Sequence, residues 1–120
     1  MPAATEAHHR RIAEMTYASV HPLYVAKVEK KGRTQAELQE VLTWLTGYTE
    51  QDIEGHLDRK TTFVEFFAEA ELNPRAELVT GVICGYRIEE LDNALTRQVR
   101  VLDKLVDELA KGRAMEKILR

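Results

Sequence analysis

Apolar residues recur along most of the chain at the spacing of amphipathic α-helices. The longest such stretch lies between residues 93 and 111, where large apolar residues alternate at intervals of four and three: Leu95, Val99, Leu102, Val106 and Leu109. This pattern predicts a long helix with a coiled-coil-like apolar stripe. Asp92 can cap its first turn, and Gly112 can end it.

The apolar stripe of this helix is wider than the surface of one small domain needs. Val101 and Leu105 extend the stripe on one side. Met115 and Ile118 belong to a short amphipathic tail that must bury its apolar residues against the body of the domain or against a partner. We therefore predict an interface at these four residues, through which the chain binds a second copy of itself or another protein.

Shorter helices are predicted upstream, and each begins at a side chain that can accept a backbone hydrogen bond. The four capping residues are Ser19, Thr34, Thr49 and Thr62. After Thr34 and Thr62, a glutamate three residues later completes a capping box, in which cap and glutamate satisfy each other's free backbone amides.

The most apolar stretch, residues 78–88, is predicted to form a buried central helix. Asn73 and Pro74 supply an N-cap and a first helical residue. Gly81 and Gly85 are four residues apart and would share one helix face. Without side chains on that face, a neighbouring helix could approach closely.

A strand over residues 79–88, broken by glycine, is the alternative for the same stretch. We favour the helix because residues 82–84 lack the alternation of apolar and polar side chains expected of a half-buried strand. In the helical interpretation, Cys84 lies in apolar surroundings that raise the pKa of a thiol and lower its reactivity. We therefore predict a buried, structural cysteine.

These patterns together predict an all-α fold, an irregular orthogonal bundle of about six or seven helices with a buried glycine-containing central helix. A chain of 120 residues is expected to form one domain. Residues 1–11 are polar and are predicted to be a mobile N-terminal lead-in. Residues 12–120 are then the single helical domain.

Charge and composition argue against several classes of function. The net charge of −3 provides no overall positive field for nucleic acid, and the local basic patch is small: Lys27, Lys30, Lys31 and Arg33. No apolar run approaches the roughly 20 residues of a membrane-spanning helix. A single cysteine fits a reducing compartment. We expect a cytoplasmic protein without a membrane partner, and we do not favour nucleic acid as a partner.

Motifs for catalysis and cofactor binding are missing from the sequence. It has no phosphate-binding loop, dinucleotide fingerprint, zinc-binding cysteine set or nucleophile elbow. The adjacent pair His8 and His9 and the i,i+4 pair Asp52 and His56 each offer only two metal ligands. We therefore predict no catalytic residue, no metal and no cofactor, and leave enzymatic activity open.

The densest group of polar residues follows the two glycines and consists of Tyr86, Arg87, Glu89, Glu90 and Asp92. Paired carboxylates can perform acid–base chemistry when their surroundings separate their pKa values. Charged residues at a helix end are more often simply solvated. If the chain has a small-molecule pocket, we expect it here, with aromatic residues as walls. The predicted pocket residues are Tyr24, Trp44, Tyr48, Tyr86, Arg87 and Glu89.

Four segments of the sequence resemble a bacterial family known as domain of unknown function 2200. They are ASVHPLYV at 18–25, WLTGY at 44–48, GVICG at 81–85 and LDKLVDELAKGRAMEKILR at 102–120. The resemblance runs from about Arg10 to the end and implies a small, cytoplasmic, all-helical protein. It implies no activity, substrate or catalytic residue. His21 stands where the family pattern has tyrosine, and Asn93 where it has proline.

Two functions of different classes follow from the sequence. The first is a protein-interaction or self-associating module that uses the wide apolar stripe. The alternative is a small-molecule binder or enzyme with a site near Trp44, Tyr48, Tyr86, Arg87 and Glu89. The sequence itself establishes neither.

Overall fold

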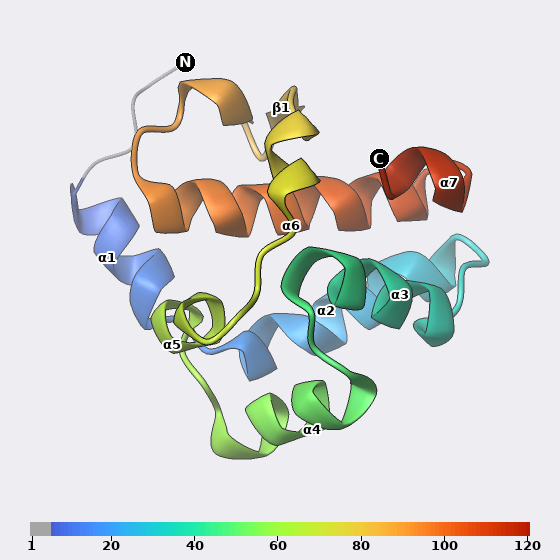
Figure 1. Cartoon of the computed structure of the whole chain (residues 1–120), viewed down its shortest axis with the longest axis horizontal. Coiled ribbons are helices and arrows are strands. Elements are labelled where there is room, and N and C mark those ends of the chain that lie inside the picture. The colour runs from blue at the N-terminus through green and yellow to red at the C-terminus, as the bar shows by residue number, and fades with distance from the viewer. Residues whose placement is uncertain (1–5) are drawn as a thin grey trace.

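Helices make up most of the chain in the computed structural model, which describes residues 6–120 (Figure 1). The α-helices of the described part are α1 Glu6–Glu14, α2 Tyr17–Lys30, α3 Gln35–Thr46, α4 Glu50–Arg59, α5 Phe63–Ala68, α6 Ala94–Ala110 and α7 Met115–Ile118. Between α5 and α6 lie the 3-10 helices η1 Pro74–Leu78 and η2 Ile88–Glu90 and the strands β1 Val82–Ile83 and β2 Tyr86–Arg87. The predicted all-α bundle is confirmed.

The centre of the bundle is α6, which crosses the molecule and packs against α1, α2, α3, α5, α7 and the hairpin (Figure 1). Neighbours on so many sides account for the width of its apolar stripe. Val101 is 5% exposed, and Leu105 and Ile118 are fully buried within the chain. Met115 is half-buried and packs on the same core. The predicted interface residues are therefore largely used inside the molecule.

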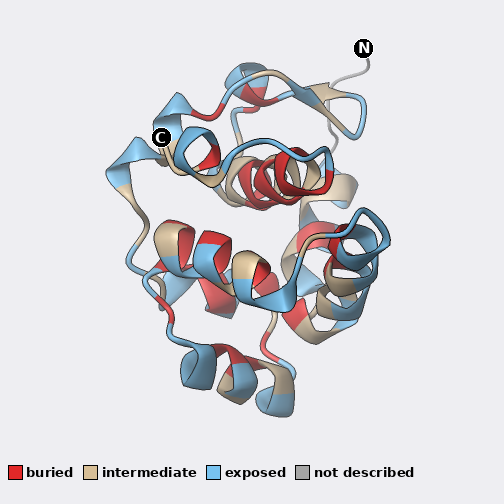
Figure 2. Ribbon diagram, turned by 90° about the vertical axis from the view of Figure 1, so that its right-hand side faces the viewer, coloured by how far each residue is buried: buried red, intermediate tan, exposed pale blue. Residues whose placement is uncertain are grey.

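A second part of the core is aromatic and lies where α2, α4 and α5 meet. The Tyr17 ring stacks on Phe66 with centroids 4.5 Å apart, and Phe63 and Phe67 pack around the same ring. Such pairs add to the stability gained from area burial. Figure 2 shows the buried positions gathered on the inward faces of the helices.

Most helix starts lie where the capping pattern predicts them. Thr34, Thr49 and Thr62 are the N-caps of α3, α4 and α5, and their hydroxyls accept from backbone amides three residues on. Helix α2 begins earlier than predicted, with its N-cap three residues before Ser19. Its N-cap is Thr16, whose side chain accepts from the amide of Ser19, so Ser19 itself belongs to the first turn.

The predicted central helix over residues 78–88 is wrong. The segment forms an antiparallel hairpin in which Val82 pairs with Arg87 and Ile83 with Tyr86. The two turn residues, Cys84 and Gly85, have φ values of +52° and +81°. Positive φ at both central residues is the conformation of the I′ hairpin turn, which matches the twist of the flanking strands.

The glycines are therefore present for backbone conformation and not for helix packing. Gly81 has φ +104°, and a Cβ on Gly85 would have no neighbour within 4 Å. Cys84 is exposed at the tip of the turn, so the predicted buried cysteine is also wrong. The alternative interpretation, a strand broken by glycine, is nearer to the observed hairpin. Val79 and Ile88, at 1% and 0% exposure, anchor its two ends in the core.

The N-terminal part of the chain is helical earlier than predicted. Residues 1–5 of the predicted lead-in lie outside the described range. Residues 6–11 belong to α1, because Ile12 on that helix is buried in the core and His9 contacts Thr96 on α6 at 2.6 Å. The assignment of residues 12–120 to a single domain stays a prediction. Within residues 6–120, no helix combines the length and apolarity needed to cross a membrane.

Candidate functional site

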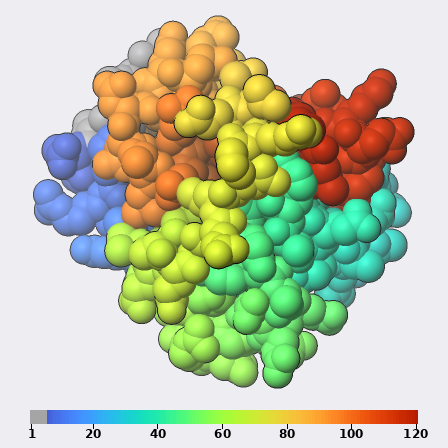
Figure 3. All heavy atoms as spheres, viewed as in Figure 1, coloured from blue at the N-terminus to red at the C-terminus, as the bar shows by residue number. Residues whose placement is uncertain are grey.

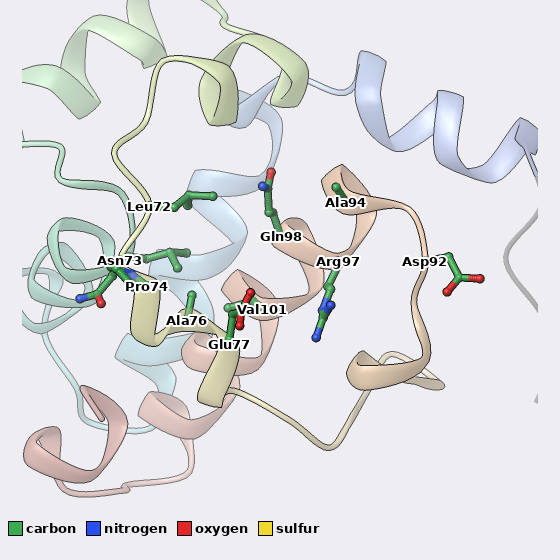
Figure 4. A pocket seen from close by; sticks show the side chains of 11 residues that line it. Leu72, Asn73, Pro74, Ala76, Glu77, Asp92, Ala94, Arg97, Gln98 and Val101 are labelled. Atoms are coloured by element: carbon green, nitrogen blue, oxygen red, sulfur yellow. The ribbon is translucent and has the colours of Figure 1, made fainter.

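A groove of about 500 Å³ runs between the first half of α6 and the segment that leads into η1 (Figure 4). In Figure 3 the two sides of this groove, the orange start of α6 and the yellow η1 segment, lie next to each other on one face. Its volume is in the range of small-molecule sites. None of the six predicted pocket residues lines it.

One wall of the groove is fixed to α3 by backbone hydrogen bonds. The amide of Glu71 donates to the Thr46 carbonyl at 2.9 Å, and the amide of Asn73 donates to the Leu45 carbonyl at 3.0 Å. The Asn73 side chain then accepts from the amide of Arg75 and starts η1. This extended wall therefore has a defined position relative to the core.

The opposite wall is the short turn that enters α6. Asn93 is the N-cap of this helix, because its side chain accepts from the amide of Thr96 at 2.9 Å. Asp92 was predicted to hold this role and does not. Its carboxylate is exposed and lines the groove instead.

The floor of the groove is apolar. Leu45 and Val101 are 1% and 5% exposed, and Leu72 and Ala76 are half-buried beside them. A ligand that covered this floor would gain the hydrophobic stabilisation of the remaining exposed apolar area. The floor therefore suits an apolar group of modest size.

Arg97 lines the groove and has no side-chain partner in the described part of the chain. Arg97 is half-buried, and its guanidinium forms no hydrogen bond or ion pair with any residue between 6 and 120. Figure 4 shows it projecting into the space between Glu77 and Asp92. Neither of these carboxylates forms an ion pair within the same range. A guanidinium in this setting can bind a planar anion through two parallel hydrogen bonds.

The predicted pocket residues Tyr24 and Tyr86 meet in a different place, on the neighbouring part of α6. The Tyr24 hydroxyl donates to Asp103 at 2.6 Å, and Arg100 donates to the same carboxylate at 2.9 Å. The Arg100 guanidinium also lies over the Tyr86 ring, 5.5 Å from its centroid. Burial, together with the Asp103 carboxylate, raises the pKa of Tyr24 well above its usual value.

The other predicted pocket residues are separated from that pair. Trp44 is half-buried against the core. Tyr48 donates its hydroxyl proton to the Phe66 carbonyl, and burial raises its pKa to about 12. Arg87 is exposed and faces Glu90 at 3.9 Å, and Glu89 accepts from the amide of Gly81 at 3.3 Å. In Figure 1 the hairpin and the α3–α4 turn that holds Tyr48 lie in different parts of the molecule.

The candidate metal pairs have other partners. Asp52 accepts from the amide of Thr49 and completes the cap of α4, and this hydrogen bond lowers the pKa of its carboxyl. His56 is buried and its Nδ1 lies 2.9 Å from the Thr61 hydroxyl. Within residues 6–120, no group of three metal-binding side chains comes together.

A second hollow, of about 410 Å³, lies between α2, α3 and α4 and includes His21. The His21 Nδ1 lies 2.7 Å from the hydroxyl of buried Tyr17. Because Tyr17 has no other polar partner within residues 6–120, we assign its proton to this hydrogen bond. His21 then carries its own proton on Nε2, and burial lowers its pKa. Glu50 and Glu54 line the far side, both on the exposed surface of α4.

Sequence reasoning missed the Arg97 groove. The spacing of apolar residues between 93 and 111 places Arg97 on the polar face of the long helix, and one helix alone does not show what lies opposite that face. No sequence signal marked the extended segment that lies opposite it. Glu77 lies in η1, which follows that segment, and Asp92 lies in the turn before α6, and neither position follows from periodicity.

Comparisons with known proteins show similarity to a bacterial family and to a solved structure. The bacterial family DUF2200, described as "Uncharacterized protein conserved in bacteria", matches residues 11–120. A crystal structure titled "uncharacterized protein SP1917" is 42% identical and superposes with a TM-score of 0.84, over 92% of this chain and 91% of that one. A comparison with the curated proteins found no match.

Proposed function

The chain belongs to the bacterial family DUF2200, and, since that membership carries no activity, we propose from its own geometry that it binds a small organic anion in the groove around Arg97. The observation that carries this proposal is that Arg97 is half-buried in the groove and that its guanidinium has no partner among residues 6–120. A guanidinium that makes no contact within the protein can bind an anion without first breaking an ion pair. Carboxylate and phosphate are the anions whose geometry it matches.

The shape of the groove supports a small ligand over a macromolecule. Its apolar floor at Leu45 and Val101 belongs to the same lining as Arg97. An organic anion can place its apolar part on that floor while its charged group faces Arg97. The lining set holds no serine, threonine, cysteine, lysine, histidine or tyrosine, and we propose binding as its function.

A thermal-shift screen of carboxylates and phosphates tests this proposal. A ligand present at a hundred times its Kd stabilises the folded chain by about 2.7 kcal/mol, which raises the melting temperature by several degrees. We expect Arg97→Gln to lose this stabilisation. Arg87→Gln is the matched control, because Arg87 is exposed and lies outside the groove.

Two results would overturn the proposal. One is a library of carboxylates and phosphates, amino acids included, in which no compound stabilises the wild-type chain. The other is an anion that stabilises Arg97→Gln as strongly as it stabilises the wild type.

A cytoplasmic location is part of the same proposal. Cys84 is exposed at the hairpin tip and is the only cysteine of the chain. A lone accessible thiol persists in a reducing compartment, whereas an oxidising one favours its conversion to disulfides.

A further inference from the structure

We infer that the ligand of the Arg97 groove is a zwitterion, an α-amino acid with an apolar side chain. This inference rests on the proposed function, because it takes Arg97 as the site of the ligand's carboxylate. It adds a second polar contact, between the ligand's ammonium group and the carboxylates of Glu77 and Asp92. The inference follows from the charges around Arg97 and from the groove floor.

The groove is lined by one positive and two negative side chains, so a simple anion would add a further negative charge. One guanidinium, that of Arg97, stands between the two carboxylates of Glu77 and Asp92 (Figure 4). No other lysine, arginine or histidine lines the groove. An anion without a positive group would share the groove with both carboxylates, and like charges repel. A dianion such as a phosphate ester would be repelled more.

A zwitterion removes this imbalance. Its carboxylate can form two parallel hydrogen bonds with Arg97, and its ammonium group carries three donors that a carboxylate of Glu77 or Asp92 can accept. Both acids are exposed and neither forms an ion pair within residues 6–120, so they can turn toward a ligand without breaking a contact. The two acids lie on different walls, Glu77 in η1 and Asp92 before α6.

The floor adds a preference for an apolar side chain. Leu45, Leu72 and Val101 are the large apolar residues of the lining. Gln98 and Asn73 are the neutral polar residues of the lining, and Asn73 already uses its side chain to start η1. A charged side chain on the ligand would lie on this floor without a partner.

The test uses matched sets of three compounds and the full chain. L-leucine, 4-methylpentanoate and 3-methylbutylamine share one apolar body. The first carries both charged groups, the second only the carboxylate and the third only the ammonium group. L-phenylalanine, with its deaminated acid and its decarboxylated amine, forms a second set. Binding is followed by NMR titration of backbone amides in the 72–77 and 92–98 segments. We expect the amino acid to bind at least tenfold more tightly than either analogue.

Variants separate the two roles. At least one of the two substitutions Asp92→Asn and Glu77→Gln should reduce the preference for the amino acid over its deaminated acid. Arg97→Gln should weaken both of these compounds. Arg87→Gln should leave both unchanged, because Arg87 lies outside the groove.

The outcomes distinguish this inference from the proposed function. If 4-methylpentanoate binds as tightly as L-leucine and Arg97→Gln weakens it, the groove binds anions and the zwitterion inference is overturned. If no compound shifts the amides of either segment, or if Arg97→Gln changes nothing, both proposals are overturned. A preference for the amino acid that survives both Asp92→Asn and Glu77→Gln also overturns the inference.

Discussion

Two arginines on α6, Arg97 and Arg100, lie less than one helical turn apart in very different surroundings. Arg100 is 15% exposed, donates to Asp103 at 2.9 Å, lies over the Tyr86 ring and approaches the His8 Nε2 at 3.5 Å. Arg97 is also half-buried and has none of these kinds of partner within residues 6–120. A guanidinium enclosed by partners holds elements together, whereas an unpaired one is available to a ligand.

The hairpin is the reason for this difference. It places Tyr86 over Arg100, and Lys104 donates to the carbonyl of Val82 in β1 at 3.2 Å. The groove lies beyond the edge of this cover, between η1 and the turn before α6. The same 25-residue connection between α5 and α6 therefore covers one arginine and leaves its neighbour open.

The largest expected effect is the loss of stability when Arg100 is replaced, compared with the same replacement at Arg97. Arg100→Met should destabilise the fold by roughly 2–3 kcal/mol, because Asp103 keeps only the Tyr24 hydroxyl as a partner for its part-buried charge. Arg97→Met should change the free energy of unfolding by less than about 0.5 kcal/mol. Urea denaturation of both variants measures the difference. Equal losses would show that the two arginines do not differ in structural role.

A smaller effect is expected from the turn that holds the hairpin over Arg100. Gly85→Ala should cost about 1–2 kcal/mol, because an L-residue at φ +81° brings Cβ close to its own backbone. The surrounding space is open, so packing adds no cost. Cys84→Gly should change stability in the opposite direction, by up to about 1 kcal/mol, because it relieves a non-glycine residue at φ +52°.

Both turn variants are measured by urea denaturation. A gain in stability for Gly85→Ala would contradict the left-handed conformation at this residue. Binding in the groove should survive both changes, because neither residue lines it.

The smallest effect concerns the ionisation of His8 beside Arg100. Partial burial and then the positive charge of Arg100 lower the pKa of His8. Arg100→Met should therefore raise this pKa, whereas Arg97→Met should leave it unchanged. NMR titration of the His8 ring protons in both variants measures the shift. An equal rise in the two variants would mean that Arg100 has no particular contact with His8.

The sign of the matching stability change follows from the same shift. A histidine whose pKa is lower in the folded state binds fewer protons when folded than when unfolded. Its contribution is complete above the unfolded pKa of about 6.5 and is lost as the pH falls through the folded value. The pKa values of His21 and His56 are lowered by burial in the same way. Stability should therefore decrease as the pH falls below about 6.5.

Local patterns predicted the helices well, because each helix carries its own periodicity and cap. The stripe of α6 and the capping threonines of α3, α4 and α5 all depend on residues within a few positions of each other. The same reasoning failed at residues 78–88. Gly81 and Gly85 share a helix face at a spacing of four, but both adopt positive φ, which a helix does not allow.

A signal for the hairpin was present but weak. Two residues, Cys84 and Gly85, separate Ile83 from Tyr86, and a residue followed by glycine between two short apolar or aromatic runs is a turn signal. Strands of two residues are too short to show alternation. The Arg97 groove could not be predicted at all, because it depends on how far the extended 70–73 segment lies from α6 after folding.

The hydrogen bond from the Asn73 amide to the Leu45 carbonyl makes the motion of the groove wall measurable by hydrogen exchange. This amide can exchange its proton with solvent only when the 70–73 segment separates from the end of α3. The exchange rate at Asn73 therefore reports how often the groove wall lifts, even when the helices remain intact. A molecule held between that wall and Arg97 would slow exchange at Asn73 and at Glu71, whose amide bonds to the Thr46 carbonyl, without altering the exchange of the α2 core.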